Sequence, residues 1–332
     1  MTNFSDRFIH LKGFITLRLN QKLPKSEIEF KHEIQNATIP TLLNSTKLWT
    51  LTATSKPGHI ELLHQSLNRL HANCSEIQDP QDISQFDELA KMTMRLFDHL
   101  ELPDKALQFY YEFDNCFLDS ATASFILMNL LFKRKRYDDI LMVYRIRTIN
   151  RKRESTSLHK TLVYATCYKL NTPESLQYSI EIYKECTSIK DQRKGRYFIA
   201  MLALNQNQLE LALTIADDDD LIANNIKLLA MAKLNDWPGV CDLLYKIKTN
   251  RLIDGTRYRV FTEVLQQIKQ SLDLAKPNLT WQEYTRCHRF IQEFVYLGKL
   301  VLRVATMDEI LCQPIESKRP IEYLSSKKLK LM

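Results

Sequence analysis

Residues 119–140 read DSATASFILMNLLFKRKRYDDI, and this stretch carries the clearest signal of the fold. An apolar run over residues 122–132 predicts one helix, and a second predicted helix begins at Tyr137 and ends near Ile149. The connection between them consists of four consecutive basic residues, Lys133, Arg134, Lys135 and Arg136. A single helix pair cannot bury its apolar face, so this pair needs similar neighbours to pack against.

The same pattern restarts every 34 to 36 residues on both sides of this stretch. One column, at the opening of each second helix, consists of Ala106, Ile140, Leu176 and Ala212, spaced by 34, 36 and 36 residues. The start of a further second helix, Trp237-Pro238-Gly239-Val240, follows after only 28 residues, counted from Ala212 to Val240. Repetition at this period predicts an all-α chain whose helix pairs stack into a right-handed solenoid.

When the pattern of the central pair is followed toward both termini, it predicts four segments in the chain. We expect an N-terminal extension over residues 1–38, an array of helix pairs over 39–250, a C-terminal helical cap over 251–315 and a basic tail over 316–332. Within the array, further pairs are predicted at 39–54 with 58–71, 83–100 with 103–113, 158–170 with a helix that Thr172-Pro173 begins, and 197–204 with 209–216.

Composition excludes several classes of protein. Six glycines in 332 residues favour helices over many short strands, and no apolar run reaches the roughly 18 residues of a membrane span. The seven cysteines are widely spaced and include no Cys-x-x-Cys pair, which favours a reducing compartment and argues against a zinc site. No histidine pair has metalloprotease spacing and no nucleophile elbow is present, so we expect no catalysis, no cofactor and no metal. Four consecutive acids at Asp217 to Asp220 are interpreted as a solvated loop.

Positive charge is concentrated in the middle of the chain. Residues 121–200 hold 16 Lys and Arg against 7 Asp and Glu, although the whole chain carries only +7. Such an asymmetry is typical of a surface that binds a polyanion, and a face for an acidic protein would look the same. The candidate phosphate-binding residues are Lys133, Arg134, Lys135, Arg136, Arg145, Arg147, Arg151, Lys152 and Arg153. The alternative for the turn itself is a solvated connection, since cations also favour helix C-termini.

The stretch from Asp119 to Ile140 resembles a pentatricopeptide repeat. The match consists of an aromatic-Leu-Ile first helix, a Lys-rich turn and a Tyr-Asp-Asp-aliphatic start to the second helix. Residues 167–175 (CYKLNTPES), 203–207 (ALNQN) and 308–312 (DEILC) also resemble members of this family, and the likeness covers about residues 40–315. The resemblance implies a protein of the mitochondrial matrix that takes part in processing or maturation of organellar RNA and so supports the respiratory chain.

In that family the first helices line a groove for single-stranded RNA, and one polar residue in each repeat reads a base. The corresponding positions here, by register, are Phe125, Thr161 and Tyr197. Only Thr161 is of the usual type, and aromatic side chains stack on bases without discriminating among them. A code of one base for each repeat is therefore in doubt for this chain.

The first 24 residues carry four basic residues and one acid, with Phe4, Phe8, Leu11 and Ile15 on one helical stripe. This pattern is compatible with a mitochondrial transit segment and equally with an ordinary first helix, and a longer presequence ahead of Met1 remains an alternative.

The leading expectation is a non-catalytic protein that binds single-stranded mitochondrial RNA. The alternative is a helical-repeat scaffold or ribosome-associated subunit whose partners are other RNA-processing or ribosomal proteins. A third hypothesis is an endonuclease, which would need to give a metal-dependent cleavage product.

Overall fold

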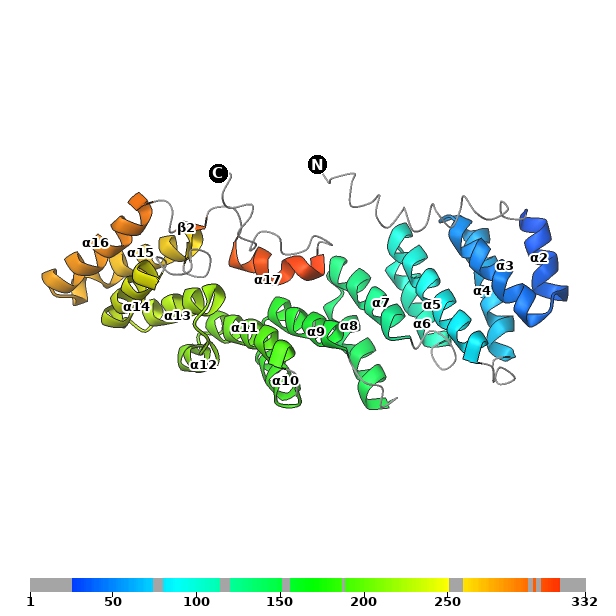
Figure 1. The fold of residues 1–332 in the computed structure, drawn as a ribbon, viewed down its shortest axis with the longest axis horizontal. Helices are drawn as coiled ribbons and strands as arrows, with labels where there is room; N and C mark the ends of the chain where they lie inside the picture. Colours follow the sequence, from blue (N-terminus) through cyan, green and yellow to red (C-terminus); the bar gives the residue numbers. More distant parts are fainter. Residues whose placement is uncertain are drawn as a thin grey trace. The chain divides into compact units, whose positions relative to one another are not determined.

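A computed structural model describes residues 26–73, 80–113, 120–150, 156–186, 189–250, 259–297, 301–302 and 306–316. The chain folds as two compact units, residues 1–159 (unit 1) and 160–332 (unit 2), and each is described by itself. Figure 1 draws the described residues almost entirely as helices. The expectation of an all-α chain built from helix pairs is thus confirmed for these residues, apart from one pair of two-residue strands.

Unit 1 consists of helix pairs whose first helices α3, α5 and α7 pack on one another in order. The second helices α4 and α6 also pack together, and the core between the layers holds Leu63, Phe97 and Leu131. Its elements are α2 (Glu27–Asn36), α3 (Ile39–Thr52), α4 (Pro57–Ala72), α5 (Pro80–Leu100), α6 (Pro103–Phe113), α7 (Ala121–Lys133), α8 (Tyr137–Arg145) and the π-helical turn η2 (Ile146–Asn150).

Helix α2 lies inside the segment that we expected to be an extension. Its Phe30 ring stacks on Trp49 of α3 with centroids 4.6 Å apart, and Arg69 of α4 donates hydrogen bonds to the carbonyls of Glu33 and Ile34 at 3.1 and 2.7 Å. The helix end is therefore satisfied by a side chain from the next pair, which fixes α2 on α3 and α4. Residues 1–24, where a transit segment was considered, lie outside the described residues.

Unit 2 continues the pattern of pairs and then departs from it. In unit 2, α11 packs on α13 and α13 on α15, while α14 packs on α16. Its elements are α9 (Ser157–Leu170, starting just before the division), α10 (Pro173–Lys184), α11 (Ile189–Asn205), α12 (Leu209–Ile215), α13 (Leu221–Lys233), α14 (Trp237–Asn250), β1 (Val260–Phe261), α15 (Thr262–Ala275), the 3-10 turn η3 (Lys276–Asn278), α16 (Trp281–Leu297), β2 (Val301–Leu302) and α17 (Met307–Glu316).

Two details of unit 2 differ from the expectation. Helix α13 occupies residues for which we predicted no helix, and a short strand, β1, directly precedes α15 in the segment that we expected to be a helical cap. The strand pair is parallel, with Val260 opposite Val301. The buried amide of Asn225 in α13 donates to the carbonyl of Arg259 and accepts from the N–H of Phe261, each at 2.9 Å. A side chain from α13 thus satisfies backbone groups beside β1.

The turns inside the helix pairs share one backbone conformation. A non-glycine residue with positive φ sits in each of five turns: Glu101 (60°), Lys135 (58°), Asn171 (52°), Asn207 (59°) and Asn235 (60°). Their spacings of 34, 36, 36 and 28 residues equal those of the column Ala106, Ile140, Leu176, Ala212 and Val240. The period found in the sequence is therefore also a period of the backbone.

Four of the five turns are closed by the same hydrogen bond. The N–H of the residue after the left-handed position bonds to the carbonyl five residues earlier: Leu102 to Phe97 (3.0 Å), Arg136 to Leu131 (2.9 Å), Gln208 to Ala203 (2.8 Å) and Asp236 to Met231 (2.9 Å). This bond satisfies a carbonyl that the helix end would leave open. After Asn171 the N–H of Thr172 bonds instead to Ser175 Oγ at 3.0 Å, as part of a capping box.

Candidate nucleic-acid interface

The basic turn, residues 133–136, connects α7 to α8 in unit 1. The left-handed conformation of Lys135 and the bond from Arg136 N–H to the Leu131 carbonyl reverse the chain within four residues. All four basic side chains therefore leave the helix pair at the same end, where the C-terminus of α7 also favours positive charge. The structure thus places these four predicted residues at one turn of unit 1.

Three of the four side chains form ion pairs with acids that lie about one repeat earlier. Lys133 Nζ is 2.6 Å from Asp98 Oδ1, Arg134 pairs with Glu101, and Arg136 pairs with Asp104. Arg136 also binds Asp139 of its own helix at 2.6 Å. These acids belong to α5, to the turn that follows it and to the start of α6. Sequence reasoning missed them, although the separations of 35, 33 and 32 residues are close to the period of the helix pairs.

Exposure decides how firmly these pairs hold the cations. The side chains of Arg134 and Glu101 are 39% and 68% exposed, and Asp104 is 84% exposed. Ion pairs this open to solvent contribute about 0.2–1 kcal/mol each, and salt screens them. A phosphate group competes with such carboxylates at little cost. Lys135 is exposed and forms no ion pair among the residues that the structure describes.

The arginines beyond the turn are not equivalent. Arg145 is exposed near the end of α8, whereas Arg147 in η2 is only 4% exposed. A buried guanidinium does not reach a phosphate in solvent, so this structure does not support the expected role of Arg147. The other three candidates, Arg151, Lys152 and Arg153, lie outside the described residues.

Arg147 acts instead on a buried histidine. The side chain of His159 is fully buried, and its Nε2 lies 2.9 Å from Ser124 Oγ while its Nδ1 lies 2.7 Å from Thr156 Oγ1. Burial, together with the nearby positive charge of Arg147, lowers the pKa of His159 to about 4. The imidazole is therefore neutral near neutral pH, and within unit 1 it links α7 to the first turn of α9, whose residues 157–159 belong to that unit.

The three predicted base-reading positions do not present three free side chains. In unit 1, Phe125 is partly buried and its ring meets the edge of His159 with centroids 6.0 Å apart. In unit 2, Thr161 is only 6% exposed. The hydroxyl of Tyr197 donates to Asp220 and accepts from Arg193 Nε at 2.9 Å. Of the three side chains, only Phe125 is neither fully buried nor hydrogen-bonded through a polar group.

Residues 217–220 form a loop with Asp217 and Asp219 exposed, as expected, but Asp220 is buried and has a structural role. Asp220 is 8% exposed and caps α13 by accepting from the Ala223 N–H at 3.0 Å, and Arg193 Nη2 binds the same carboxylate at 2.7 Å. Burial alone raises the pKa of Asp220, but the bonds from Tyr197, Arg193 and the helix N-terminus outweigh it and lower that pKa. Asp218 and Asp219 form further ion pairs, with Arg196 at 3.0 Å and Lys246 at 2.9 Å.

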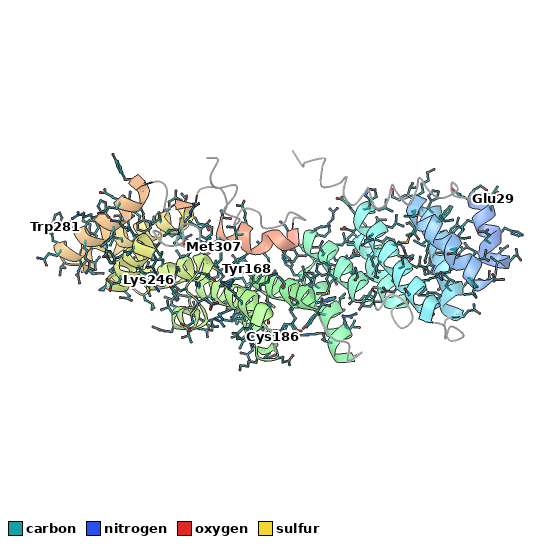
Figure 2. The ribbon with its side chains drawn as sticks, viewed as in Figure 1. Glu29, Tyr168, Cys186, Lys246, Trp281 and Met307 are labelled. Atoms are coloured by element: carbon teal, nitrogen blue, oxygen red, sulfur yellow. The ribbon has the colours of Figure 1, made fainter. Side chains whose placement is uncertain are left out.

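Helix α17 covers part of the first-helix face in unit 2. Lys169 of α9 binds both carboxylate oxygens of Asp308 at 3.0 and 2.9 Å, and the Met307 N–H donates to Glu263 of α15 at 2.7 Å. Burial and the nearby Asp308 raise the pKa of Tyr168, which Figure 2 labels on α9. Because Tyr168 follows Thr161 by two helical turns, it shares a face with that position. No local pattern in the sequence indicates the ion pair between Lys169 and Asp308, which are 139 residues apart.

No group of three or more possible metal ligands occurs within the described ranges, and no helix among the same residues is long and apolar enough to cross a membrane. The chemistry that these residues offer is that of surface cations, hydrogen bonds and aromatic rings.

No family model matches the chain, and no solved structure matches it. Pentatricopeptide repeat-containing protein 2, mitochondrial, of Mus musculus is 29% identical over 54% of this chain and 49% of its own length. The human protein of the same name is 24% identical over 64% of this chain and 56% of its own length. The chain thus spans about half the length of these curated relatives.

The protein of that name from Danio rerio is 25% identical, and the match covers 97% of this chain and 80% of the fish protein. All five curated matches carry the same name. The resemblance found in residues 119–140 is therefore confirmed: the chain is similar to mitochondrial pentatricopeptide repeat proteins, at 24–29% identity.

Proposed function

We propose that this protein binds single-stranded RNA in the mitochondrial matrix, without catalysing a reaction itself. It takes part in processing or maturation of organellar mRNA and so supports the respiratory chain. The names of its relatives, which are mitochondrial pentatricopeptide repeat proteins, support the compartment and the class. In this proposal residues 39–250 form a right-handed superhelical array, and residues 251–315 cap it.

The basic turn is the observation that carries the proposal. Its four cations leave one end of a helix pair, and the carboxylates that hold two of them, Glu101 and Asp104, are themselves largely exposed. Phosphates bind such a surface by displacing weak ion pairs and releasing counterions. Lys135 and Arg145 are both exposed and add two further cations to this surface.

Base contacts have a smaller share in this proposal. Thr161 is buried and the Tyr197 hydroxyl is engaged by Asp220, which leaves Phe125 as the aromatic ring most available to a base. A partly buried ring offers stacking but no hydrogen-bond readout. We therefore expect strong dependence on salt and weak dependence on RNA sequence.

The test is a filter-binding titration of RNA at several salt concentrations. The variant Lys133→Ala/Arg134→Ala/Lys135→Ala/Arg136→Ala should weaken binding to all sequences alike. Removal of one phosphate-binding cation lowers the slope of log affinity against log salt by about 0.7, so the slope should fall by up to about 3. Phe125→Ala should cost roughly 1–3 kcal/mol if it stacks on a base, and should leave the slope unchanged.

A matched variant removes the competing acids instead. Asp98→Asn/Glu101→Gln/Asp104→Asn keeps the shape of the three side chains but frees the cations of the basic turn. It should bind RNA more tightly and with a steeper salt slope than the wild type. Unchanged affinity in both this variant and the alanine variant would overturn the assignment of the basic turn to RNA.

A second candidate function is a protein-interaction scaffold or ribosome-associated subunit. The ion pairs favour it, because three of the four cations join neighbouring helix pairs of unit 1 and so have a structural use without RNA. For a scaffold, the alanine variant should lower the melting temperature while RNA affinity and salt slope stay unchanged.

A further inference from the structure

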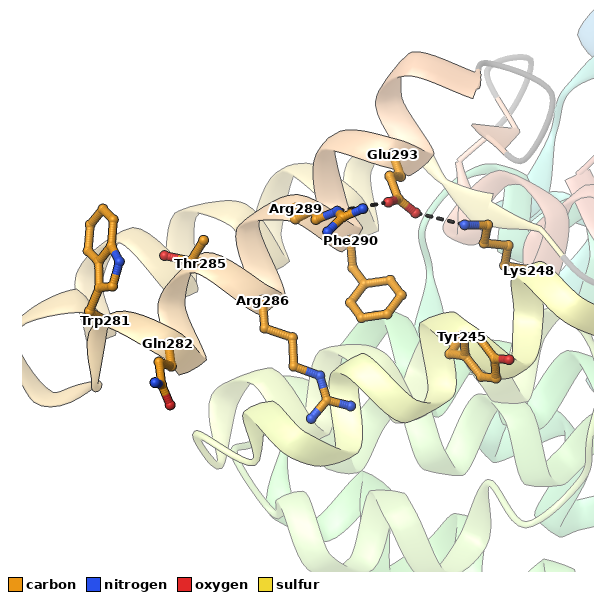
Figure 3. Close-up of a pocket in the computed structure, with 9 residues that line it drawn as sticks. All are labelled: Tyr245, Lys248, Trp281, Gln282, Thr285, Arg286, Arg289, Phe290 and Glu293. Atoms are coloured by element: carbon orange, nitrogen blue, oxygen red, sulfur yellow. Dashed lines mark hydrogen bonds and ion pairs between the residues drawn. The ribbon is translucent and has the colours of Figure 1, made fainter.

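A groove of about 530 Å³ lies between α14 and α16 in unit 2, away from the first-helix face. Tyr245 and Lys248 line it from α14, and Trp281, Arg286, Arg289 and Phe290 line it from α16. Figure 3 shows Arg286 and Phe290 between Trp281 at one end and Tyr245 at the other. The groove-lining positions on α16 are 281–282, 285–286, 289–290 and 293, which repeat every four residues and so share one face of that helix.

The aromatic side chains of this groove are unusually open to solvent. Trp281 is 76% exposed and Tyr245 is 59% exposed, whereas the other tryptophans, Trp49 and Trp237, are 5% and 1% exposed. An exposed Trp forfeits most of the stabilisation that burial gives such a large ring. Exposed aromatic side chains that gather along a groove mark a surface that binds something.

The two walls of the groove are held together by contacts beneath and beside it. Cys241 Sγ of α14 lies 2.9 Å from Cys287 Sγ of α16, with both thiols buried. Lys248 Nζ binds Glu293 at 2.8 Å, and Arg286 binds Asp242 at 3.2 Å. The groove is therefore present before any ligand arrives, which reduces the entropy cost of binding.

Charge identifies the class of ligand. The groove carries Lys248, Arg286 and Arg289 against Glu293, and Arg289 and Arg286 are 81% and 58% exposed. Each guanidinium has five N–H donors, and one carboxylate partner leaves several of them for an anion. Exposed rings with exposed guanidinium groups between them suit a chain of flat bases joined by phosphates.

We propose that this groove binds a short stretch of single-stranded RNA, with bases stacked on Trp281 and Tyr245 and phosphates held by Arg286 and Arg289. Its face on α16 from Trp281 to Glu293 extends about 18 Å at 1.5 Å per residue. The proposal rests on the RNA binding proposed above and adds a second contact surface on helices α14 and α16.

The experiment follows Trp emission of the full chain while a short uridine oligonucleotide is added. Since Trp281 is the exposed tryptophan, RNA should quench it, and Trp281→Phe should lose the signal while keeping the affinity. Trp281→Ala should weaken binding by roughly 5- to 150-fold, the range for one stacked base. Arg286→Gln/Arg289→Gln should lower the salt slope by about 1.4, at 0.7 for each phosphate contact.

The control is Tyr296→Ala, because Tyr296 lies on the same helix, is 93% exposed and does not line the groove. It should bind RNA as the wild type does, and circular dichroism should show all variants folded. If the chain binds no RNA at any salt concentration, the proposed function itself fails. If it binds RNA through the basic turn while Trp281 emission and the Trp281→Ala affinity stay unchanged, only the groove is excluded. Quenching by an acidic peptide but not by RNA would also overturn the groove assignment.

Discussion

The turns inside the helix pairs of unit 1 and unit 2 share a backbone but not a sequence. In unit 2 the left-handed position is Asn171, Asn207 and Asn235, while in unit 1 it is Glu101 and Lys135. Asn adopts this conformation more easily than most residues because its short amide side chain hydrogen-bonds locally, whereas Glu and Lys have no such help. The residues at the left-handed position in unit 2 therefore favour that conformation. Those in unit 1 are charged and adopt it at a cost in conformational free energy.

The surroundings of the turns differ in the same way. In unit 1, Arg134 of one turn forms a surface ion pair with Glu101 of the preceding turn, whereas in unit 2 Gln206 beside Asn207 donates to the Thr172 carbonyl at 2.7 Å. A neutral bond from side chain to backbone is insensitive to salt, but exposed ion pairs are screened by it. The same turn geometry thus supports hydrogen bonds between helix pairs in unit 2 and places charged side chains at the surface in unit 1.

The largest expected effect comes from disrupting the core beneath one turn in each unit. Leu131 and Ala203 are both fully buried, and their carbonyls accept the bond that closes the turn. Leu131→Asp and Ala203→Asp each bury an unpaired carboxylate, which costs several kcal/mol. Urea unfolding followed by circular dichroism should show the decrease in stability. Proteolysis should cut unit 1 in the first variant and unit 2 in the second.

Leu131→Met is the control for the first variant, since a hydrophobic replacement of similar volume costs less than about 1.5 kcal/mol. Identical cleavage patterns in the two aspartate variants would show that the two units do not unfold separately. The stabilities of unit 1 and unit 2 could then not be compared.

The next effect separates the units by pH. Because the folded-state pKa of His159 lies below its unfolded value of about 6.5, the unfolded chain takes up the proton first. The stability that neutral His159 gives is full above pH 6.5 and is lost as the pH falls to about 4, on the order of 3 kcal/mol. Urea midpoints of unit 1, followed by proteolysis at several pH values, would measure this decrease.

His159→Gln is the matched variant, because its amide reaches toward Ser124 and carries no titrating proton. It should flatten the acid dependence between pH 6.5 and 4 even if it lowers stability at neutral pH. Wild-type and variant curves that stay parallel over this range would contradict the role assigned to His159.

The smallest effect exchanges residues at the left-handed position itself. Lys135→Gly should stabilise unit 1 by about 0.5–1 kcal/mol, because glycine has no side chain to clash at positive φ. Asn207→Lys should destabilise unit 2 by a similar amount. The measurement is the urea midpoint at constant m-value.

Lys184→Gly serves as the control for this exchange, since Lys184 is exposed and helical at the end of α10. The glycine there should cost rather than add stability. If Lys135→Gly destabilises the protein, the side chain of Lys135 has a stabilising contact that outweighs its backbone strain.

Local sequence was enough to find the period of the helix pairs and to locate most of the pairs and their turns, although it missed α13. Apolar spacing and turn residues act within a few positions of one another, so residues 119–140 predict α7, the basic turn and the start of α8 without reference to the rest of the chain. The likeness to known repeats came from the same short stretches.

What surrounds the predicted site depended on the tertiary structure. The ion pair of Lys133 with Asp98, the burial of Arg147 and the engagement of Tyr197 by Asp220 all depend on which segments pack together. Charge and polarity at one position do not reveal the partner, since that partner lies 23 to 35 residues away. Helix stacking brings it within hydrogen-bond distance, and this is why the cations could be located from sequence but their accessibility could not.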